Sequence, residues 1–238
     1  NIAENKQIEN NSDVITQSLM QIYIKEFKKS KIAKLGFFII LAVIAIALLA
    51  PVISPYDPIK QSLSESLQGP SLKHFFGTDD LGRDIFSRVL YGARIALLVG
   101  FIVIMIGMTI GVAIGLIAGY FGGWLDSIFM RIMDVLLAFP FFLLAIIISG
   151  TLGPGLVNAM IAVGIASLPS YSRLARGLTL STKESDYVQS ARALGCSNFK
   201  IIVKHILPNI IGPIIVYGTL RVSTAIISTA GLSFLGLG

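Results

Sequence analysis

Five long apolar stretches run through this chain, and shorter polar segments separate them. A helix needs about 20 apolar residues to cross the hydrocarbon core of a bilayer. On that criterion the sequence predicts spans near 35–53, 95–118, 124–149, 156–176 and 208–232. We therefore expect an all-α, polytopic membrane protein whose transmembrane domain covers residues 35–238.

Small residues are placed regularly inside the second of these spans. Gly107, Gly111, Gly115 and Gly119 recur every four residues, so a helix carries them on one face. Such a face lets a neighbouring helix approach closely. The third span is interrupted by Pro140.

Residues 1–34 precede the first span as a polar, lysine-rich tail. Ile15, Leu19, Ile22 and Phe27 lie near helical spacing. This pattern predicts an amphipathic helix on the cytoplasmic surface of the membrane. The alternative is a disordered basic anchor.

Composition agrees with a membrane protein, because 13% of the residues are charged, against about 25% in an average soluble domain. The net charge of +6 could indicate nucleic acid as a partner. The basic residues, however, cluster at the ends of apolar spans, which is typical of cytoplasmic anchoring at lipid. We therefore expect no nucleic acid. The single cysteine, Cys196, cannot form an internal disulfide.

The distribution of Lys and Arg predicts orientation. The N-terminal tail and residues 169–205 are both rich in these residues, and the loop 150–155 has none. Alternating spans then place the N-terminus in the cytoplasm. Residues 54–94 would be external although they also carry Lys and Arg, which disagrees with the rule that these residues are enriched on the cytoplasmic side. Because five spans leave the C-terminus outside, we expect a sixth span beyond Gly238.

Residues 186–208, here called the docking element, form an organised polar loop between two spans. Ser181 and Glu184 have the spacing of a capping box, and Tyr187–Leu194 would form a short helix. Gly195 ends it in a left-handed conformation, and Ser197 caps a second helix. Tyr187, Ala191 and Leu194 would share one face suited to a groove on a partner. The alternative is an ordinary interfacial helix.

Several motifs resemble one family. Gln189-Ser190-Ala191, three residues and Gly195 are similar to the E-A-A-x-x-x-G coupling motif of permease subunits in binding-protein-dependent ABC importers. The stretches FGTDDLGRDIFSR (76–88), GYFGGWLDSIFMRIMDVLLAFP (119–140) and GLSFLGLG (231–238) look like the C-type subunit of its dipeptide, oligopeptide and nickel branch. The chain departs from the family at Gln189 and Thr229, where Glu is common.

The resemblance implies the type I ABC importer permease fold in a bacterial inner membrane. It implies one transmembrane subunit of an ATP-driven peptide importer. The partners would be a homologous permease, two ATP-binding subunits that use ATP and Mg, and an extracytoplasmic substrate-binding protein. The residues expected to couple to the ATPases are Tyr187, Gln189, Ser190, Ala191, Arg192, Leu194 and Gly195. The alternatives are a nickel or metal-chelate importer and, in a different class, a stand-alone channel or ion-coupled carrier.

The chain itself is not expected to be an enzyme or to bind a cofactor. It contains no G-x-x-x-x-G-K-[ST] motif for ATP. Its two histidines, His74 and His205, lie far apart in sequence, without the Cys or paired carboxylates of a zinc site. ATP-driven transport would therefore take its energy from another polypeptide.

Ionisable residues inside spans are expensive and indicate function. Arg131 and Asp134 are three residues apart and can pair on one helix face. Arg221 lies within the last span, where it could face the translocation path and attract a carboxylate, or pair with Asp134. We take Arg221 and Asp134 as candidates for the substrate path.

The segment after the first span contains a group of charged residues, namely Asp79, Asp80, Arg83 and Asp84. They are candidates for contact with an external partner. The three carboxylates could instead ligate a metal, or they could cap helices and pair with Arg83 and Arg88. We expect the caps and ion pairs rather than a metal.

Overall fold

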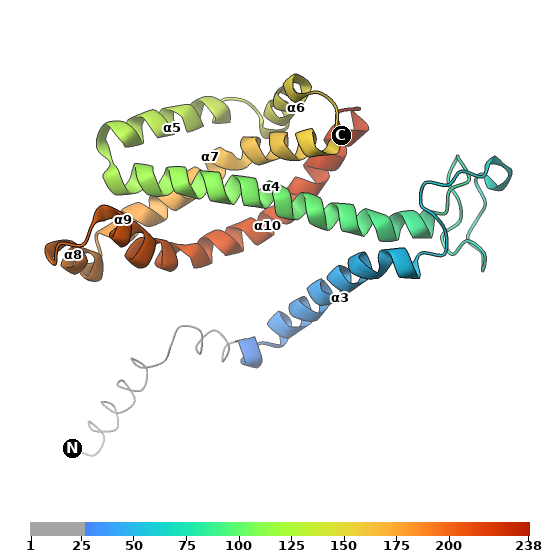
Figure 1. Ribbon diagram of the computed structural model, residues 1–238, viewed down its shortest axis with the longest axis horizontal. Helices are drawn as coiled ribbons and strands as arrows, with labels where there is room; N and C mark the ends of the chain where they lie inside the picture. Colours follow the sequence, from blue (N-terminus) through green and yellow to red (C-terminus); the bar gives the residue numbers. More distant parts are fainter. Residues whose placement is uncertain (1–26) are drawn as a thin grey trace, which may run out of the picture. The chain divides into compact units, whose positions relative to one another are not determined.

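A computed structural model describes residues 27–238, and Figure 1 shows its helices. Of the residues that predicted an amphipathic helix in the tail, Ile15, Leu19 and Ile22 lie outside the described residues, and Phe27 is the first described residue. Within residues 27–238 every regular element is a helix, apart from an isolated bridge between Thr78 and Asp84. The elements are α3 (Lys31–Ile53), η1 (Leu63–Glu65), α4 (Ile85–Phe121), α5 (Gly123–Leu137), α6 (Phe141–Leu152), α7 (Leu156–Lys183), α8 (Asp186–Ala193), α9 (Asn198–Ile201), η2 (Ile202–Ile206) and α10 (Leu207–Phe234).

The chain divides into two compact units, Asn1–Arg94 and Ile95–Gly238. The first contains α3, the segment 54–84 and the first turns of α4. Its helix α3 is capped by Ser30, whose hydroxyl oxygen accepts a hydrogen bond from the Ala33 N–H at 3.1 Å. The second unit contains the rest of α4 and all later helices.

In the second unit, α4 and α7 pack together through the predicted glycine face. A Cβ atom on Gly111 would lie 2.7 Å from Cβ of Tyr171, and one on Gly119 would lie 2.9 Å from Cβ of Thr179. Real Cβ atoms essentially never approach that closely. The spacing of four residues therefore indicated a helix contact correctly, and the partner is α7.

Fewer helices qualify as apolar spans than the sequence predicts. By length and composition, Lys31–Ile53, Ile85–Phe121 and Asn198–Phe234 could cross a membrane. The predicted third span is not one straight helix, because α5 and α6 meet at 94°. Proline has no N–H and disfavours helical backbone at the preceding residue, which accounts for the break at Pro140. Counting this bent pair, the described residues hold up to four spans rather than five.

The remaining predicted span corresponds to α7, which is helical over 28 residues. It is not apolar enough to qualify by composition, since it carries arginines and several hydroxyl side chains. Twelve of its residues are buried, including Tyr171, Ser172 and Thr179. Neighbouring helices therefore enclose much of α7, and polar residues are tolerated where protein rather than lipid surrounds them.

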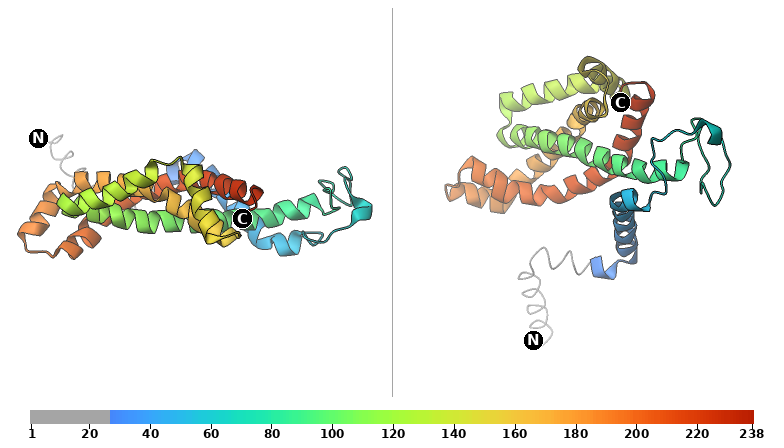
Figure 2. Two further views of the ribbon diagram at one scale, coloured as in Figure 1. Left: turned by 90° about the horizontal axis from the view of Figure 1, so that it is seen from above. Right: turned by 45° about the vertical axis from the view of Figure 1, so that its right-hand side comes forward.

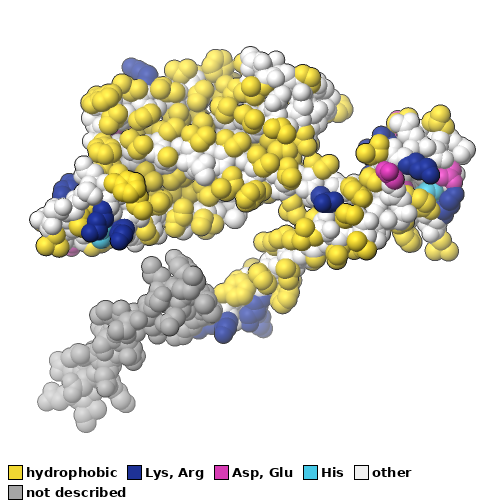
Figure 3. Space-filling view, viewed as in Figure 1, with side chains coloured by type: hydrophobic (Ala, Val, Ile, Leu, Met, Phe, Trp, Pro, Cys, Tyr) yellow, Lys and Arg dark blue, Asp and Glu magenta, His cyan; other side chains and the backbone are white. Residues whose placement is uncertain are grey.

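Two apolar clusters form the core of the second unit. One joins α4, α6, α7 and α10 around Val103, Ala145 and Val163. The other joins the end of α4 to α7, α8, α9 and α10 around Leu116, Val188 and Ile206. Both views of this unit show α8 and α9 at one end and α6 with the C-terminus at the other (Figure 2). Basic side chains gather at the α8–α9 end, while the surface over α4 and α10 is largely apolar (Figure 3).

Candidate functional site

The docking element folds as a short helix, a glycine break and a second helix. The helix α8 spans Asp186–Ala193 and follows Ser185. The expected capping box at Ser181 and Glu184 is wrong, because α7 continues through Ser181 to Lys183. Ser185 instead makes the turn, and its hydroxyl donates to the carbonyl of Thr182 at 2.6 Å.

Gly195 ends this helix as expected, with φ of 78°. In that left-handed region a side chain on residue 195 would be strained, so glycine suits the position. The N–H of Cys196 then donates to the carbonyl of Ala191 at 3.1 Å. Ser197 caps α9, since its hydroxyl oxygen accepts from the N–H of Lys200 at 3.4 Å.

The exposed face of α8 differs from the predicted one. Ala191 is buried at 7% exposure together with Val188, so it faces the protein's own core. Tyr187 is 45% exposed and Leu194 is 84% exposed. The other residues expected to contact the ATPases, namely Gln189, Ser190, Arg192 and Gly195, are also exposed. Phe199 of α9, which was not among the predicted residues, adds a side chain that is 77% exposed.

Three contacts join this end of the molecule to α4. The guanidinium of Arg192 lies over the ring of Tyr120, 5.6 Å from its centroid. The hydroxyl of Tyr120 donates to Oδ1 of Asn198 at 2.8 Å, and Nζ of Lys183 donates to the carbonyl of Gly119 at 3.0 Å. These contacts hold the docking element against the last turn of α4. The sequence pattern gave no signal for these partners, which are far apart along the chain.

Ion pairs join α5 to α7. Nε and Nη2 of Arg176 lie 2.5 and 2.6 Å from the two carboxylate oxygens of Asp126. Nη2 of Arg173 lies 2.6 Å from Oδ1 of Asp134. These two pairs, here called the α5–α7 seam, line an open cleft of about 650 Å³ together with Arg131. The expected pairing of Asp134 with Arg131 or Arg221 is therefore wrong, because Arg173 takes that position.

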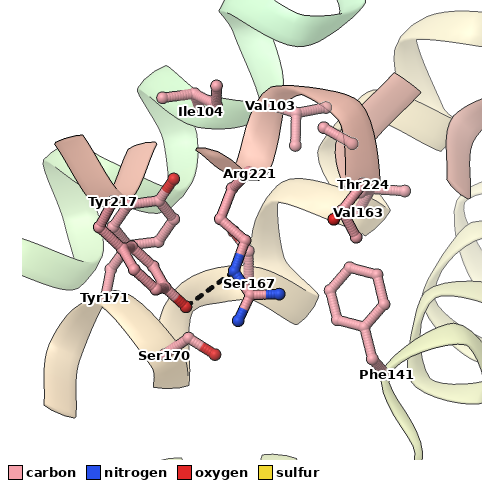
Figure 4. Close-up of a pocket in the computed structure, with 11 residues that line it drawn as sticks. Val103, Ile104, Phe141, Val163, Ser167, Ser170, Tyr171, Tyr217, Arg221 and Thr224 are labelled. Carbon is pink, nitrogen blue, oxygen red and sulfur yellow. Dashed lines mark hydrogen bonds between the residues drawn. The ribbon is translucent and has the colours of Figure 1, made fainter. Parts of the chain in front are cut away.

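Arg221 lies in a small cavity between α4, α7 and α10 (Figure 4). Its Nε donates to the hydroxyl of Tyr217 at 2.9 Å, and its guanidinium carbon lies 5.0 Å from the centroid of the same ring. Ser167, Ser170 and Thr224 add hydroxyl groups to the lining of this cavity, whose volume is about 40 Å³. Tyr217 was not among the predicted site residues, although a residue four positions before Arg221 lies on the same helix face.

In the segment 54–84, Asp79 organises a turn. Its carboxylate accepts hydrogen bonds from the N–H of Leu81 at 3.0 Å and of Arg83 at 2.9 Å. Nε of Arg83 and Nη1 of Arg88 each lie 2.7 Å from Oδ2. Burial would raise the pKa of Asp79, but the hydrogen bonds from Arg83 outweigh it and lower that pKa. Of the predicted contact residues, Asp80 has the most exposed side chain, at 77%.

Asp84 caps α4 from inside the protein. Its Oδ2 accepts from the N–H of Ser87 at 2.8 Å, and its Oδ1 lies 2.9 Å from Nδ1 of His74. Burial would raise the pKa of Asp84, but the hydrogen bonds from Ser87 and His74 hold it below its ordinary value. Asp84 is therefore not available to an external partner. Within residues 27–238, no group of three or more His, Cys, Asp or Glu side chains could hold a metal ion.

Comparisons with known proteins agree with this architecture. Residues 111–238 match the family described as binding-protein-dependent transport system inner membrane component. Residues 18–70 match the N-terminal TM domain of oligopeptide transport permease C. The dipeptide transport system permease protein DppC of Alkalihalophilus pseudofirmus is 48% identical over 90% of this chain and 70% of its own length. The glutathione transport system permease protein GsiD of Shigella flexneri is 49% identical over 90% of this chain and 71% of its own length.

Proposed function

The chain belongs to the family of binding-protein-dependent transport system inner membrane components, and we propose that it forms half of the translocation path of an ATP-driven importer for small peptides. The names of its relatives support a peptide, since they refer to dipeptides and to glutathione. A nickel or metal-chelate importer would use the same scaffold, but neither name points to it. Membership of a permease family also disfavours a channel or carrier that works alone.

The observation that carries this proposal is the docking element. Permease subunits of this family have no ATPase site, and the sequence contains no phosphate-binding loop. Energy must therefore reach the helices through contact with separate ATP-binding subunits. Tyr187, Leu194 and Phe199 supply exposed apolar surface at one end of the second unit. Exposed groups of large apolar side chains are typical of protein interaction sites.

The contacts behind this surface are suited to transmit movement. Val188 is fully buried and packs in the same cluster as Leu116 of α4 and Ile210 of α10. The Tyr120 ring and the Gly119 carbonyl tie the docking element to the end of α4. A close-packed interior transmits displacement instead of absorbing it. Closure of the ATPases would then rock α4, α7 and α10 together between inward-open and outward-open states.

The distribution of basic residues supports the proposed orientation. Lys and Arg are frequent in the N-terminal tail and in residues 169–205, whereas the loop 150–155 has none, and cytoplasmic loops carry an excess of these residues. We therefore propose that the N-terminus and the docking element are cytoplasmic and that, with alternating spans, segment 54–84 is external. The membrane would be the bacterial inner membrane.

The partners follow from this arrangement. A homologous permease would complete the path, two ATP-binding subunits would bind at the docking elements, and an extracytoplasmic binding protein would deliver the peptide. Arg221 remains our candidate for the path. Asp134 is less suited to contact the substrate because Arg173 already neutralises it. Asp80 is the best placed of the external candidates for contact with the binding protein.

The docking surface can be tested by replacing its apolar side chains with acids. We expect the double variant Leu194→Asp and Phe199→Asp to reduce co-purification of the ATP-binding subunits at least tenfold. Both side chains are largely exposed, so the permease itself should still fold. The measurement is a pull-down of the co-expressed complex through a tag on this chain, with the homologous permease as an internal reference.

Leu72→Asp is the matched control, because Leu72 is 95% exposed in the external segment 54–84. It should leave co-purification unchanged. Gly195→Pro should also release the ATPases, since φ of 78° is inaccessible to proline. Full-strength co-purification in both the double variant and Gly195→Pro would overturn the docking role of residues 186–208.

A further inference from the structure

Arg221 lies at the middle of α10, with about the same number of residues to each end of Leu207–Phe234. An arginine at the centre of an isolated transmembrane helix is unfavourable, and such residues usually face a cavity or the interior of a bundle. Such a residue therefore has a compensating interaction or a function. Tyr217 supplies one compensation, through the hydrogen bond of 2.9 Å to Nε and through its ring face.

The two terminal nitrogens of the guanidinium group make no hydrogen bond within residues 27–238. Within residues 27–238 no carboxylate pairs with Arg221, and only its Nε has a hydrogen-bond partner. Figure 4 shows the two terminal nitrogens directed away from Tyr217, toward the space bordered by Ser170 and Phe141. Four N–H donors of a planar cation are therefore available on the cavity side.

The cavity around these donors fits a small oxyanion. Its volume is about 40 Å³, more than the 10–15 Å³ that one water molecule requires, and too little for a whole peptide. The hydroxyl groups of Ser170 and Thr224 line it and make no hydrogen bond within the described part of the chain. Phe141 and Val163 form its apolar wall. A planar group with two acceptor oxygens would satisfy the terminal nitrogens and a hydroxyl together.

We propose that Arg221 binds the carboxylate of the transported solute, which for a peptide is its C-terminal carboxylate. This inference rests on the proposed function. A guanidinium binds a carboxylate through two parallel hydrogen bonds, and Tyr217 holds Nε so that the terminal nitrogens keep facing the cavity. Ser170 supplies a further donor. The site then recognises a feature that all linear peptides share, so it selects for peptides without selecting among side chains.

The test compares dialanine with dialanine amide, which lacks the carboxylate. The complete complex is reconstituted in vesicles, and uptake is measured with a saturating amount of binding protein that is loaded with one of the two probes. Because the binding protein is saturated, any difference in its affinity for the two probes does not affect the comparison. We expect Arg221→Gln to lower uptake of dialanine at least tenfold and to leave uptake of the amide unchanged or increased. Tyr217→Phe, which keeps the charge but releases Nε, should lower dialanine uptake about threefold.

Basal ATPase activity and subunit composition serve as readouts of assembly. Thr219→Val is the matched control on α10, because Thr219 lies outside the Arg221 cavity, and it should leave the discrimination intact. Equal uptake of dialanine by wild type and by an assembled Arg221→Gln complex would overturn the inference. If Arg221→Gln lowers uptake of both probes equally, the residue is structural and the inference is also overturned. A wild-type complex without ATP-dependent dialanine uptake would contradict the proposed function instead.

Discussion

The arginines of the α5–α7 seam and the arginine of α10 are placed in opposite electrostatic surroundings. Arg176 meets both oxygens of Asp126, and Arg173 meets one oxygen of Asp134. Among residues 27–238, Arg221 has a hydrogen bond to the phenol of Tyr217 and no carboxylate partner. All three belong to helices of the same unit, so the difference lies in their partners.

This difference separates two uses of a charge in a membrane protein. When the partner of a charged side chain is in the same chain, the ion pair offsets the free-energy cost of burying the charge at all times, and it fixes one helix against another. When the charged side chain has no such partner, that free-energy cost is offset only while an external ion is bound. The seam is therefore expected to contribute to stability, and the Arg221 cavity is expected to contribute to transport.

The largest expected effect on stability comes from breaking the bidentate pair of the seam. Removing one partner of a buried pair costs about 3–5 kcal/mol, whereas exposed pairs contribute about 0–1 kcal/mol. The side chains of Arg176 and Asp126 are 33% and 19% exposed, so we expect Asp126→Asn to cost an intermediate ~2 kcal/mol. For a chain of this length, that corresponds to a melting temperature lower by about 4–8 °C.

Thermal unfolding of the purified complex measures this effect. Ser127→Ala is the matched control, because Ser127 is the next residue of α5, lines the same cleft and carries no charge. An Asp126→Asn complex that melts at the wild-type temperature would mean that the pair does not support the α5–α7 contact.

The second pair should matter less, because water reaches it. The side chains of Arg173 and Asp134 are 55% and 52% exposed, and exposed pairs contribute about 0–1 kcal/mol. We therefore expect Asp134→Asn to lower the melting temperature by no more than about 4 °C. A shift larger than that of Asp126→Asn would reverse the order that exposure predicts.

The smallest change in stability is expected at Arg221. Arg221 has no ion pair within residues 27–238, so the melting temperature of Arg221→Gln should stay the same or rise slightly, even though peptide uptake falls. The same thermal measurement tests it. A loss as large as that of Asp126→Asn would contradict this expectation, because it would indicate that another subunit of the complex supplies a carboxylate partner to Arg221.

Local patterns in the sequence predicted the features that depend on neighbouring residues. The spacing of Gly107, Gly111, Gly115 and Gly119 indicated the close helix contact, since four residues return to the same helix face. Gly195 and Ser197 indicated the break and the second cap in the docking element, because each acts on backbone groups within a few residues. The isolated arginine at position 221 was recognisable from its apolar surroundings alone.

Features that depend on distant residues could not be predicted in this way. Asp134 had a possible partner three residues away, but Arg173 of α7 occupies that place. Ser181 had the spacing of a cap, but α7 continues past it to Lys183, whose side chain reaches the carbonyl of Gly119. The spacing of Tyr187, Ala191 and Leu194 predicted one exposed face, but Ala191 is buried against the core behind α8. In each case a contact with a residue far away in the sequence determined which of the locally possible pairings, caps or faces is formed.

The most direct test of the account is peptide uptake into vesicles that contain this chain and its homologous permease, with and without the two ATP-binding subunits. The binding protein and dialanine are supplied on the external side of the membrane, and ATP is supplied on the cytoplasmic side. We expect uptake against a gradient only when the ATP-binding subunits and ATP are both present. Uphill uptake by the permeases alone would contradict it.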